Sequence, residues 1–255
     1  MNPIPAIVLA GGKSSPEMIA VTGVSNRALT LIDGEPMVTH IINALRGSEF
    51  VENIVVVGDN IPVIDNILRH PDQGGLVDNI FAGMDALSVT DRVLVSTSDI
   101  PFIRPEMITD FIEEGLKLNA DLIYPIVPVG KCSDRFPGIH RTSVALREGR
   151  FTGGNMMLLN ASFFRSKRDI ITAAYTARKS PMRLASMMGM DIILRLIAAM
   201  TLFPSALSLN QLERTASRVL GGNAKAYISP WPEIATDIDK PEDIVALKTI
   251  QINPQ

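Results

Sequence analysis

Four short, almost continuous apolar runs constrain the fold of this chain more than any other feature. They cover residues 6–10, 54–57, 92–95 and 122–127. None of them alternates between apolar and polar residues, as a strand with one solvent-facing side would. Each is therefore predicted to be a strand with helices on both faces. Because helical patterns of about 10–15 residues separate the runs, they predict βαβ units and a mostly parallel sheet.

Two of the intervening segments have the spacing of a packed helix face. Apolar residues recur at i, i+3 or i+4 over 37–45, after an Asp33-Gly34 turn. The same spacing occurs over 108–116, after Pro105, which suits the first turn of a helix. Both segments are therefore predicted to be helices that pack on the sheet.

The composition changes at about residue 161. From 162 to 220 the β-branched runs give way to Arg, Lys, Met, Ala and Leu. This predicts a helical lobe over about 162–222, before the chain returns to the sheet near Tyr227 and Ile228. No repeat or Gly/Ser linker divides the sequence. We expect a single α/β domain over 1–255, a three-layer Rossmann-like sheet with helices on both faces and this helical insertion.

Composition excludes several classes of function. The 255 residues include 24 Lys and Arg against 27 Asp and Glu, a formal net charge of −3. This balance does not attract polyanions, so we expect no nucleic-acid partner and only local binding of phosphate. A single cysteine, Cys132, excludes an intrachain disulfide framework, and three scattered histidines exclude a structural zinc site. Any metal is expected to be held by oxygen ligands.

We expect a cytoplasmic protein. The N-terminal residues lack a basic region and lead into a glycine pair, which predicts a strand rather than a signal peptide. The uncharged run 196–212 contains Pro204, so it predicts no transmembrane segment. A peripheral lipid contact over 184–204 stays open. The methionine-rich part, 187–194, is interpreted as core or as the contact of a homodimer, with an apolar acceptor pocket second.

A glycine pair follows the first predicted strand. The segment reads Leu9-Ala10-Gly11-Gly12-Lys13-Ser14. Two glycines let the backbone pass close to a ligand and expose N–H groups that suit a phosphate. The pattern is neither the dinucleotide fingerprint, which needs G-x-G-x-x-G, nor a Walker loop, which needs G-K-[ST]. By itself it predicts a tight turn as well as a phosphate cradle.

Several segments, in order along the chain, resemble those of one enzyme family. They are the glycine loop, the segment from Asn26-Arg27-Ala28-Leu29 to Met37, the group Gly75, Asn79 and Gly83, then Ser98-Asp99-Ile100-Pro101, and finally 151–155 and 237–243. Together they are similar to the MobA-like NTP transferases of the GT-A-like nucleotidyltransferase superfamily, which resemble molybdenum cofactor guanylyltransferase. The resemblance implies a nucleotidyltransferase.

The resemblance also implies the nucleotide site. Asp99 ends an apolar strand, where open α/β sheets bind ligands, and its carboxylate would hold Mg²⁺; a turn or cap is its structural alternative. Arg27 stands where similar enzymes carry the lysine that reaches the triphosphate, and both residues are assigned catalytic roles. Nucleotide binding is assigned to Leu9, Ala10, Gly11, Gly12, Lys13, Ser14, Arg27, Gly75, Asp78, Asn79 and Gly83.

Two more carboxylates are candidate metal ligands. Asp237 and Asp239 lie two residues apart in a short extended stretch, and we expect their side chains to leave opposite faces, so that one meets Asp99. We favour Asp237 and keep Asp239 as a capping or outer residue that could exchange roles with it. Asp239 with Glu242 also predicts a capping box for the last helix.

Candidate acceptor residues lie in two regions. Gly154 and Asn155 follow a basic, exposed run that begins at Arg141, and they put a glycine and an amide at a strand start beside the expected site. Arg178 is one of several cations between 165 and 183. A solvated face is the ordinary explanation of such a run, and a clamp for an anionic acceptor is the functional one.

The first loop departs from the family pattern. Similar enzymes read Ser-x-Arg-Met-Gly, whereas this chain reads Ser14-Ser15-Pro16-Glu17-Met18, followed by a longer stretch to Ser25. The loop arginine is missing, which leaves Lys13 and Arg27 as the cations expected near the triphosphate.

The sequence as a whole predicts a Mg²⁺-dependent transfer of a nucleoside monophosphate from an NTP to a phosphorylated small acceptor, with release of pyrophosphate. A phosphate acceptor needs no general base, and the sequence shows no triad. A nucleotide-binding protein without turnover is the alternative that the altered loop favours. A nucleotide-sugar glycosyltransferase is the alternative that the Asp-Ile-Asp motif favours, although its place near the chain end argues against it.

Overall fold

A mixed sheet forms the centre of the molecule. The computed structural model describes residues 2–177, 180–189, 194 and 206–252. In that part of the chain nine strands follow the order β5-β4-β1-β6-β10-β7-β9-β8, with β11 paired to β7. The strands are β1 (Ile4–Leu9), β4 (Val51–Val57), β5 (Ile67–His70), β6 (Arg92–Thr97), β7 (Leu122–Pro128), β8 (Val144–Leu146), β9 (Gly149–Gly153), β10 (Met156–Asn160) and β11 (Ala224–Ile228).

The sheet is mostly parallel, as predicted. β1 pairs in parallel with β4 and β6, β4 with β5, and β7 with β11. β10 runs against β6 and β7, and β9 runs against β7 and β8. The four predicted apolar runs lie in β1, β4, β6 and β7, whereas β5, β8 and β9 were not predicted. Parallel strands place their carboxyl ends, and the loops that follow them, at one edge of the sheet.

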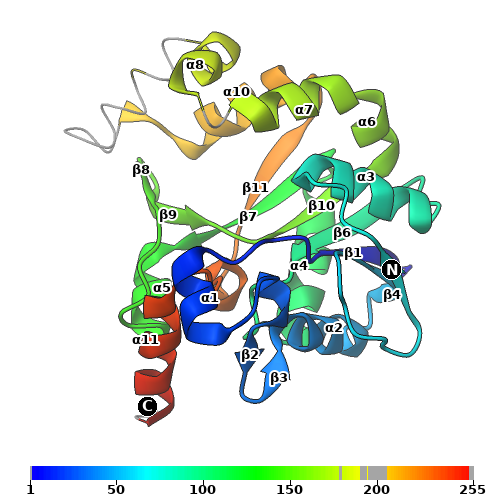
Figure 1. Cartoon of the computed structure of the whole chain (residues 1–255). Helices are drawn as coiled ribbons and strands as arrows, with labels where there is room; N and C mark the ends of the chain where they lie inside the picture. The colour runs from blue at the N-terminus through cyan, green and yellow to red at the C-terminus, as the bar shows by residue number, and fades with distance from the viewer. Residues whose placement is uncertain (1, 178–179, 190–193, 195–205, 253–255) are drawn as a thin grey trace.

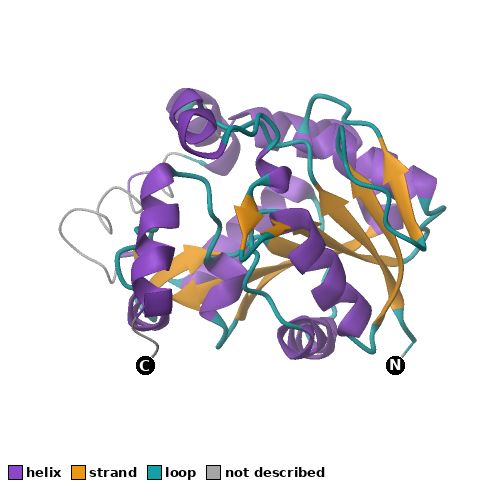
Figure 2. Cartoon of the chain, turned by 60° about the horizontal axis from the view of Figure 1, so that its bottom comes forward, coloured by secondary structure: helices purple, strands orange, loops and turns teal. Residues whose placement is uncertain are grey.

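Helices cover both faces of the sheet (Figure 2). α2 (Met37–Gly47) and α4 (Pro105–Lys117) pack on one face, and α3 (Leu76–Ala86) packs on the other. Consecutive residues of β1 show both contacts, because Val8 belongs to the first apolar cluster and Ile7 to the second, and both are fully buried. The three-layer prediction is confirmed.

The predicted turn and both predicted helix faces are present. Asp33 and Gly34 have φ angles of 51° and 85° and join β2 (Leu31–Ile32) to β3 (Glu35–Pro36), a hairpin whose two central residues need positive φ. The buried residues of α2 and α4 keep the predicted three- and four-residue spacing. β7 differs from its prediction, because its residues alternate between buried and half-buried. Its half-buried face includes Tyr124, which lines a cavity.

The described residues between 161 and 220 form the predicted helical lobe. α6 (Ala161–Ser166), α7 (Arg168–Ala177), α8 (Pro181–Met188) and α10 (Leu209–Leu220) lie together at the top of Figure 1. α10 begins with a capping box between Ser208 and Gln211 and ends at Gly221 in the left-handed region. α7 contacts α3, α8 and α10. The lobe therefore extends the helical layer that covers the α3 face of the sheet.

Two predictions fall wholly or largely outside the described residues. They are the acceptor role of Arg178 and the lipid or dimer contact of 184–204. Among the residues that the structure describes, no helix is both long and apolar enough to cross a membrane.

Gly83 allows α3 to pack closely on β1. A Cβ atom at this position would lie 2.6 Å from Cγ2 of Ile7, which is fully buried. We expect Gly83→Ala to lower the free energy of unfolding by about 1–3 kcal/mol, because an added methyl overpacks the core. Gly130 in α5 (Val129–Arg135) has no described atom within 4 Å of an added Cβ. Gly130→Ala is the control and should be neutral or stabilising in urea denaturation; equal effects of the two substitutions would contradict the packing role.

Candidate active site

Three segments meet at the carboxyl edge of the sheet. The glycine loop follows β1, and Asp99 follows β6. The backbone N–H of Ser98 donates to the carbonyl of Leu9 at 3.2 Å, and the N–H of Ile238 donates to the carbonyl of Asp99 at 2.9 Å. The loop, Asp99 and the 237–239 stretch are thus held side by side by main-chain hydrogen bonds.

The glycine loop is clamped to the segment that carries Arg27. The N–H of Ser14 donates to the carbonyl of Ser25 at 2.8 Å, and the N–H of Arg27 donates to the carbonyl of Gly12 at 2.9 Å. A Cβ on Gly12 would lie 3.0 Å from Nη2 of Arg27. The guanidinium of Arg27 therefore lies directly on the loop backbone.

Gly11 has no space for a side chain. A Cβ at this position would lie 2.2 Å from Oδ1 of Asp72 and 3.0 Å from Nδ2 of Asn79. Asn79 is buried; its Nδ2 donates to Asp72 at 2.6 Å, and its Oδ1 accepts from the N–H of Gln73 at 2.7 Å. Asn79 thus orders the 72–75 loop against the glycine loop.

These segments enclose a cavity of about 470 Å³. Eight residues predicted for the site line it: Leu9, Gly11, Gly12, Lys13, Arg27, Gly75, Asn79 and Asp99. Six residues that were not predicted for the site line it as well: Asp72, Gly74, Leu76, Thr97, Ser98 and Tyr175. Tyr175 comes from α7, so the helical lobe forms part of the cavity wall.

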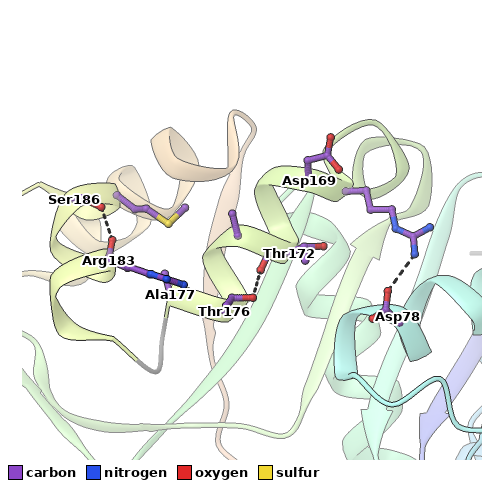
Figure 3. Close-up of a pocket in the computed structure, with 10 residues that line it drawn as sticks. Asp78, Asp169, Thr172, Thr176, Ala177, Arg183 and Ser186 are labelled. Carbon is purple, nitrogen blue, oxygen red and sulfur yellow. Dashed lines mark hydrogen bonds and ion pairs between the residues drawn. The ribbon is translucent and has the colours of Figure 1, made fainter.

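Four predicted nucleotide-binding residues do not line this cavity. Ala10 is fully buried, and Ser14 is buried with its N–H already donated to Ser25. Gly83 packs on Ile7, as described above. Asp78 points away toward α7, where it pairs with Arg168 at 3.1 Å beside a separate cavity of about 650 Å³ between α7 and α8 (Figure 3).

The guanidinium of Arg27 lies between the carboxylates of Asp99 and Asp239. Nη2 of Arg27 lies 3.0 Å from Oδ2 of Asp99, and Nη1 lies 4.0 Å from Oδ2 of Asp239. The Asp99 side chain is 9% exposed. Its other oxygen, Oδ1, is buried and has no hydrogen-bond partner among the described residues. A buried carboxylate oxygen without a partner is costly unless something else pairs with it.

Asp237 and Asp239 both face this site. Ile238 between them is fully buried, so the two carboxylates leave the same side of the extended stretch. The prediction of opposite faces was wrong, because the side chains of residues i and i+2 in extended backbone point the same way. Burial raises the pKa of Asp237; the Arg141 guanidinium lowers that pKa, and the charges of Asp99 and Asp239 raise it.

The predicted capping box is also corrected. The carboxylate of Asp243 accepts from the N–H groups of Asp239 and Lys240, at 3.2 and 3.0 Å, and so caps α11 (Pro241–Ile252). Asp243 is the third residue of the helix, the position that reaches back to the cap backbone, whereas Glu242 is the second. The side chain of Asp239 is thus available to the site.

The oxygen donors of the site suit a hard divalent cation. In the described chain no group of three or more His, Cys, Asp or Glu side chains is gathered so as to hold a metal. Mg²⁺, however, is commonly bound by one or two carboxylates together with substrate phosphates. The unpartnered Oδ1 of Asp99 and the neighbouring carboxylates of Asp237 and Asp239 supply such oxygens.

A family model now identifies the chain. The model of the MobA-like NTP transferase domain matches residues 6–220. The chain belongs to the MobA-like NTP transferase family. No curated protein matches the sequence significantly.

Solved structures of other proteins share the fold of this chain. A hypothetical transferase from Thermus thermophilus is 38% identical and superposes with a TM-score of 0.84, over 96% of this chain and 100% of that one. A CMP:2-keto-3-deoxy-manno-octonic acid synthetase complexed with CTP shares the fold at 12% identity and a TM-score of 0.58, over 100% of both chains. So does 2-C-methyl-D-erythritol 4-phosphate cytidylyltransferase from Thermus thermophilus, at 13% identity and a TM-score of 0.55, over 98% and 99%.

The first loop of this MobA-like NTP transferase continues into a helix. Ser15 caps α1 (Pro16–Thr22), because its Oγ accepts from the N–H of Met18 at 3.2 Å. Met18 is fully buried in a cluster with Ile238. The Ser-Pro-Glu sequence, a capping serine followed by proline and an acidic residue, is itself a signal for the start of a helix. Where similar enzymes are expected to carry a loop arginine, this chain has a helix anchored against the 237–239 stretch.

A second cavity of about 410 Å³ is lined by Asp237 and Asp239, whereas Asp99 lines the first cavity. Gly154 and Asn155, the candidate acceptor residues, also line the second cavity. Nδ2 of Asn155 lies 3.5 Å from Oδ1 of Asp237. The other lining residues are Tyr124, His140, Arg141, Thr142, Val144, Phe151, Thr152, Gly153, Ala235 and Lys240.

Arg141 is part of the site rather than of an exposed basic run. Its side chain is only 8% exposed; Nη1 lies 3.3 Å from Oδ1 of Asp237, and Nη2 donates to the carbonyl of Asp237 at 2.8 Å. The fixed fork of a guanidinium can thus hold both the side chain and the backbone of one residue. The burial of Arg141 could not be predicted from the neighbouring arginines, because Arg147 and Arg150 are exposed.

Proposed function

We propose that this family member transfers a nucleoside monophosphate from an NTP to a phosphorylated small molecule and releases pyrophosphate. One observation carries the proposal. The cavity of the glycine loop and the cavity of Asn155 meet at one cluster, in which Arg27 joins Asp99 of the first cavity to Asp239 of the second. Two substrates bound in these cavities would meet at the carboxylates.

The first cavity suits the NTP. The Gly11-Gly12 backbone allows close approach of phosphate groups, and Lys13 and Arg27 supply positive charge beside it. The same cavity is lined by Asp72, Gly74, Gly75, Leu76 and Asn79, and we assign the nucleoside to this side of it. Mg²⁺ held by Asp99, with Asp237 or Asp239, would neutralise phosphate charge when bound. The chain's own part is to hold the triphosphate in line with the acceptor.

The second cavity suits a small polar acceptor. Arg141 and Lys240 provide positive charge, and Thr142, Thr152 and Asn155 provide hydrogen-bonding groups. In the proposed reaction an oxygen of the acceptor phosphate forms a bond to the α-phosphorus, and the bond from that phosphorus to the bridging oxygen breaks. The electron pair leaves with pyrophosphate. A phosphate monoester is largely deprotonated at pH 7, since its second pKa is about 6, so the step needs no general base.

A nucleotide-binding protein without turnover is the second candidate. The observation that favours it is α1, which occupies the segment where similar enzymes are expected to carry the loop arginine. With that cation missing, charge on the triphosphate must be balanced by Lys13, Arg27 and the metal.

The experiment begins with a thermal-shift screen of the four NTPs with Mg²⁺, because a ligand at 100 times its Kd stabilises a protein by about 2.7 kcal/mol. The NTP that binds is then incubated with a panel of sugar, polyol and pterin phosphates. We expect pyrophosphate and a nucleotidylated product in equal amounts, and loss of both after chelation of divalent cations. A thermal shift without pyrophosphate would support the binding protein. In a parallel assay with nucleotide sugars in place of the NTP, release of the nucleoside diphosphate from the sugar would support a glycosyltransferase.

A further inference from the structure

Arg27 holds the carboxylate to which the proposed metal ion would bind. Its guanidinium contacts Oδ2 of Asp99 at 3.0 Å and approaches Asp239 at 4.0 Å. No other ion pair of Asp99 is present in the described part of the chain. A cation bound at Asp99 would therefore lie close to the guanidinium of Arg27, with only the carboxylate between the two positive charges.

The position of the Arg27 guanidinium is not imposed by the core. Its backbone N–H is tied to Gly12, but its side chain is 28% exposed and lies over the glycine loop at the wall of the nucleotide cavity. Two like charges a few ångströms apart repel each other appreciably where water is partly excluded. The side chain thus has room to turn from the carboxylates toward a ligand in this cavity.

A triphosphate is the ligand that would draw it there. A planar guanidinium binds phosphate oxygens bidentately, and charge-assisted hydrogen bonds of this kind are about twice as strong as neutral ones. An NTP would offer several such oxygens next to the loop, whereas the described part of the chain offers Arg27 only Asp99 at 3.0 Å and the more distant Asp239 at 4.0 Å.

We propose that Arg27 and a divalent cation compete for Asp99, so that the guanidinium keeps free metal out until a triphosphate draws it away. The metal then binds together with the nucleotide rather than before it. The inference rests on the proposed function for the metal at Asp99. It assigns Arg27 a second task, distinct from holding phosphate, and it gives the site an order of binding.

The test is a titration of Mn²⁺ into the intact protein without nucleotide, with free Mn²⁺ followed by electron paramagnetic resonance. Arg27→Gln should bind Mn²⁺ about tenfold more tightly than the unchanged protein, within the roughly 5- to 150-fold range usual for coupled sites. Arg27→Met is a second variant that also removes the charge, and it replaces Arg27→Gln if that variant folds poorly. Added NTP should tighten Mn²⁺ binding to the unchanged protein and have less effect on the variants.

Arg104→Gln is the matched control. It removes the same charge from an exposed pair with Glu106 and should change the Mn²⁺ affinity by less than about twofold. Equal Mn²⁺ affinities of the Arg27 variants and the unchanged protein would overturn the competition. If the double variant Arg27→Gln, Asp99→Asn kept the affinity of Arg27→Gln, the metal would not bind at Asp99, and that part of the proposed function would fail instead.

Discussion

We expect Asp99→Asn to reduce nucleotidyl transfer about a thousandfold while the protein keeps its fold. The substitution keeps the shape of the side chain but removes the negative charge that would hold the metal beside the triphosphate. A loss of several kcal/mol of transition-state stabilisation corresponds to this factor, since each tenfold is about 1.4 kcal/mol. Steady-state release of pyrophosphate, measured with the NTP that binds, is the readout.

The fold should tolerate the change because Asp99 contributes little to packing. Its carboxylate contacts Arg27, which is partly exposed and can bind water instead. We expect a melting temperature within about 3 °C of the unchanged protein, which corresponds to a change of at most about 1 kcal/mol in the free energy of unfolding at this size. Asp121→Asn is the control, since Asp121 precedes β7 at the opposite end of the sheet and accepts from the N–H of Asn223. Retained turnover in Asp99→Asn together with a much lower melting temperature would make Asp99 a structural residue.

The position of Asp99 could be predicted from the sequence because it depends on local pattern. A continuous apolar run predicts a buried strand, and Pro101 directly after the Asp99-Ile100 pair keeps the strand from continuing. The rule that parallel strands bind ligands at their carboxyl edge then places Asp99 beside the glycine loop. The hydrogen bond from Ser98 to Leu9 confirms this neighbourhood.

The roles of the α3 residues could not be predicted in the same way. A glycine in a helix can serve close packing or the close approach of a ligand, and the sequence does not distinguish the two. The structure does, because a Cβ atom at Gly83 would lie 2.6 Å from Cγ2 of Ile7. Asp78 and Asn79 are neighbours in sequence but leave α3 in different directions. Asn79 turns toward Asp72 and the cavity, and Asp78 turns toward Arg168 of the helical lobe.

Long-range partners account for the remaining differences. Arg141 is 96 residues from Asp237, and no local pattern distinguishes it from the exposed Arg147 and Arg150. Tyr175 lines the cavity of the glycine loop because α7 lies against α3. By contrast, the shared face of Asp237 and Asp239 follows from the two-residue period of extended backbone, so the sequence did contain that information.

Arg27→Ala should weaken binding of the NTP far more than binding of the matching nucleoside monophosphate. Only the triphosphate presents β- and γ-phosphate charge to the guanidinium that lies on Gly12. Loss of one charge-assisted bidentate contact, about 1.5–3 kcal/mol, corresponds to roughly 10- to 150-fold in Kd, while the monophosphate should lose less than about threefold. Isothermal titration without divalent cations isolates this contact, because the metal then cannot mask the loss.

Lys240→Ala is the control that separates local contact from bulk charge. Lys240 lines the other cavity, so its removal subtracts the same charge without touching the nucleotide. The Kd of the NTP should change by less than about twofold in this variant, because Lys240 is exposed and salt screens its charge from a ligand in the first cavity. Equal losses of NTP and monophosphate affinity in Arg27→Ala would place Arg27 away from the β- and γ-phosphates. Its guanidinium, 3.0 Å from Oδ2 of Asp99, would then serve only to hold that carboxylate in place.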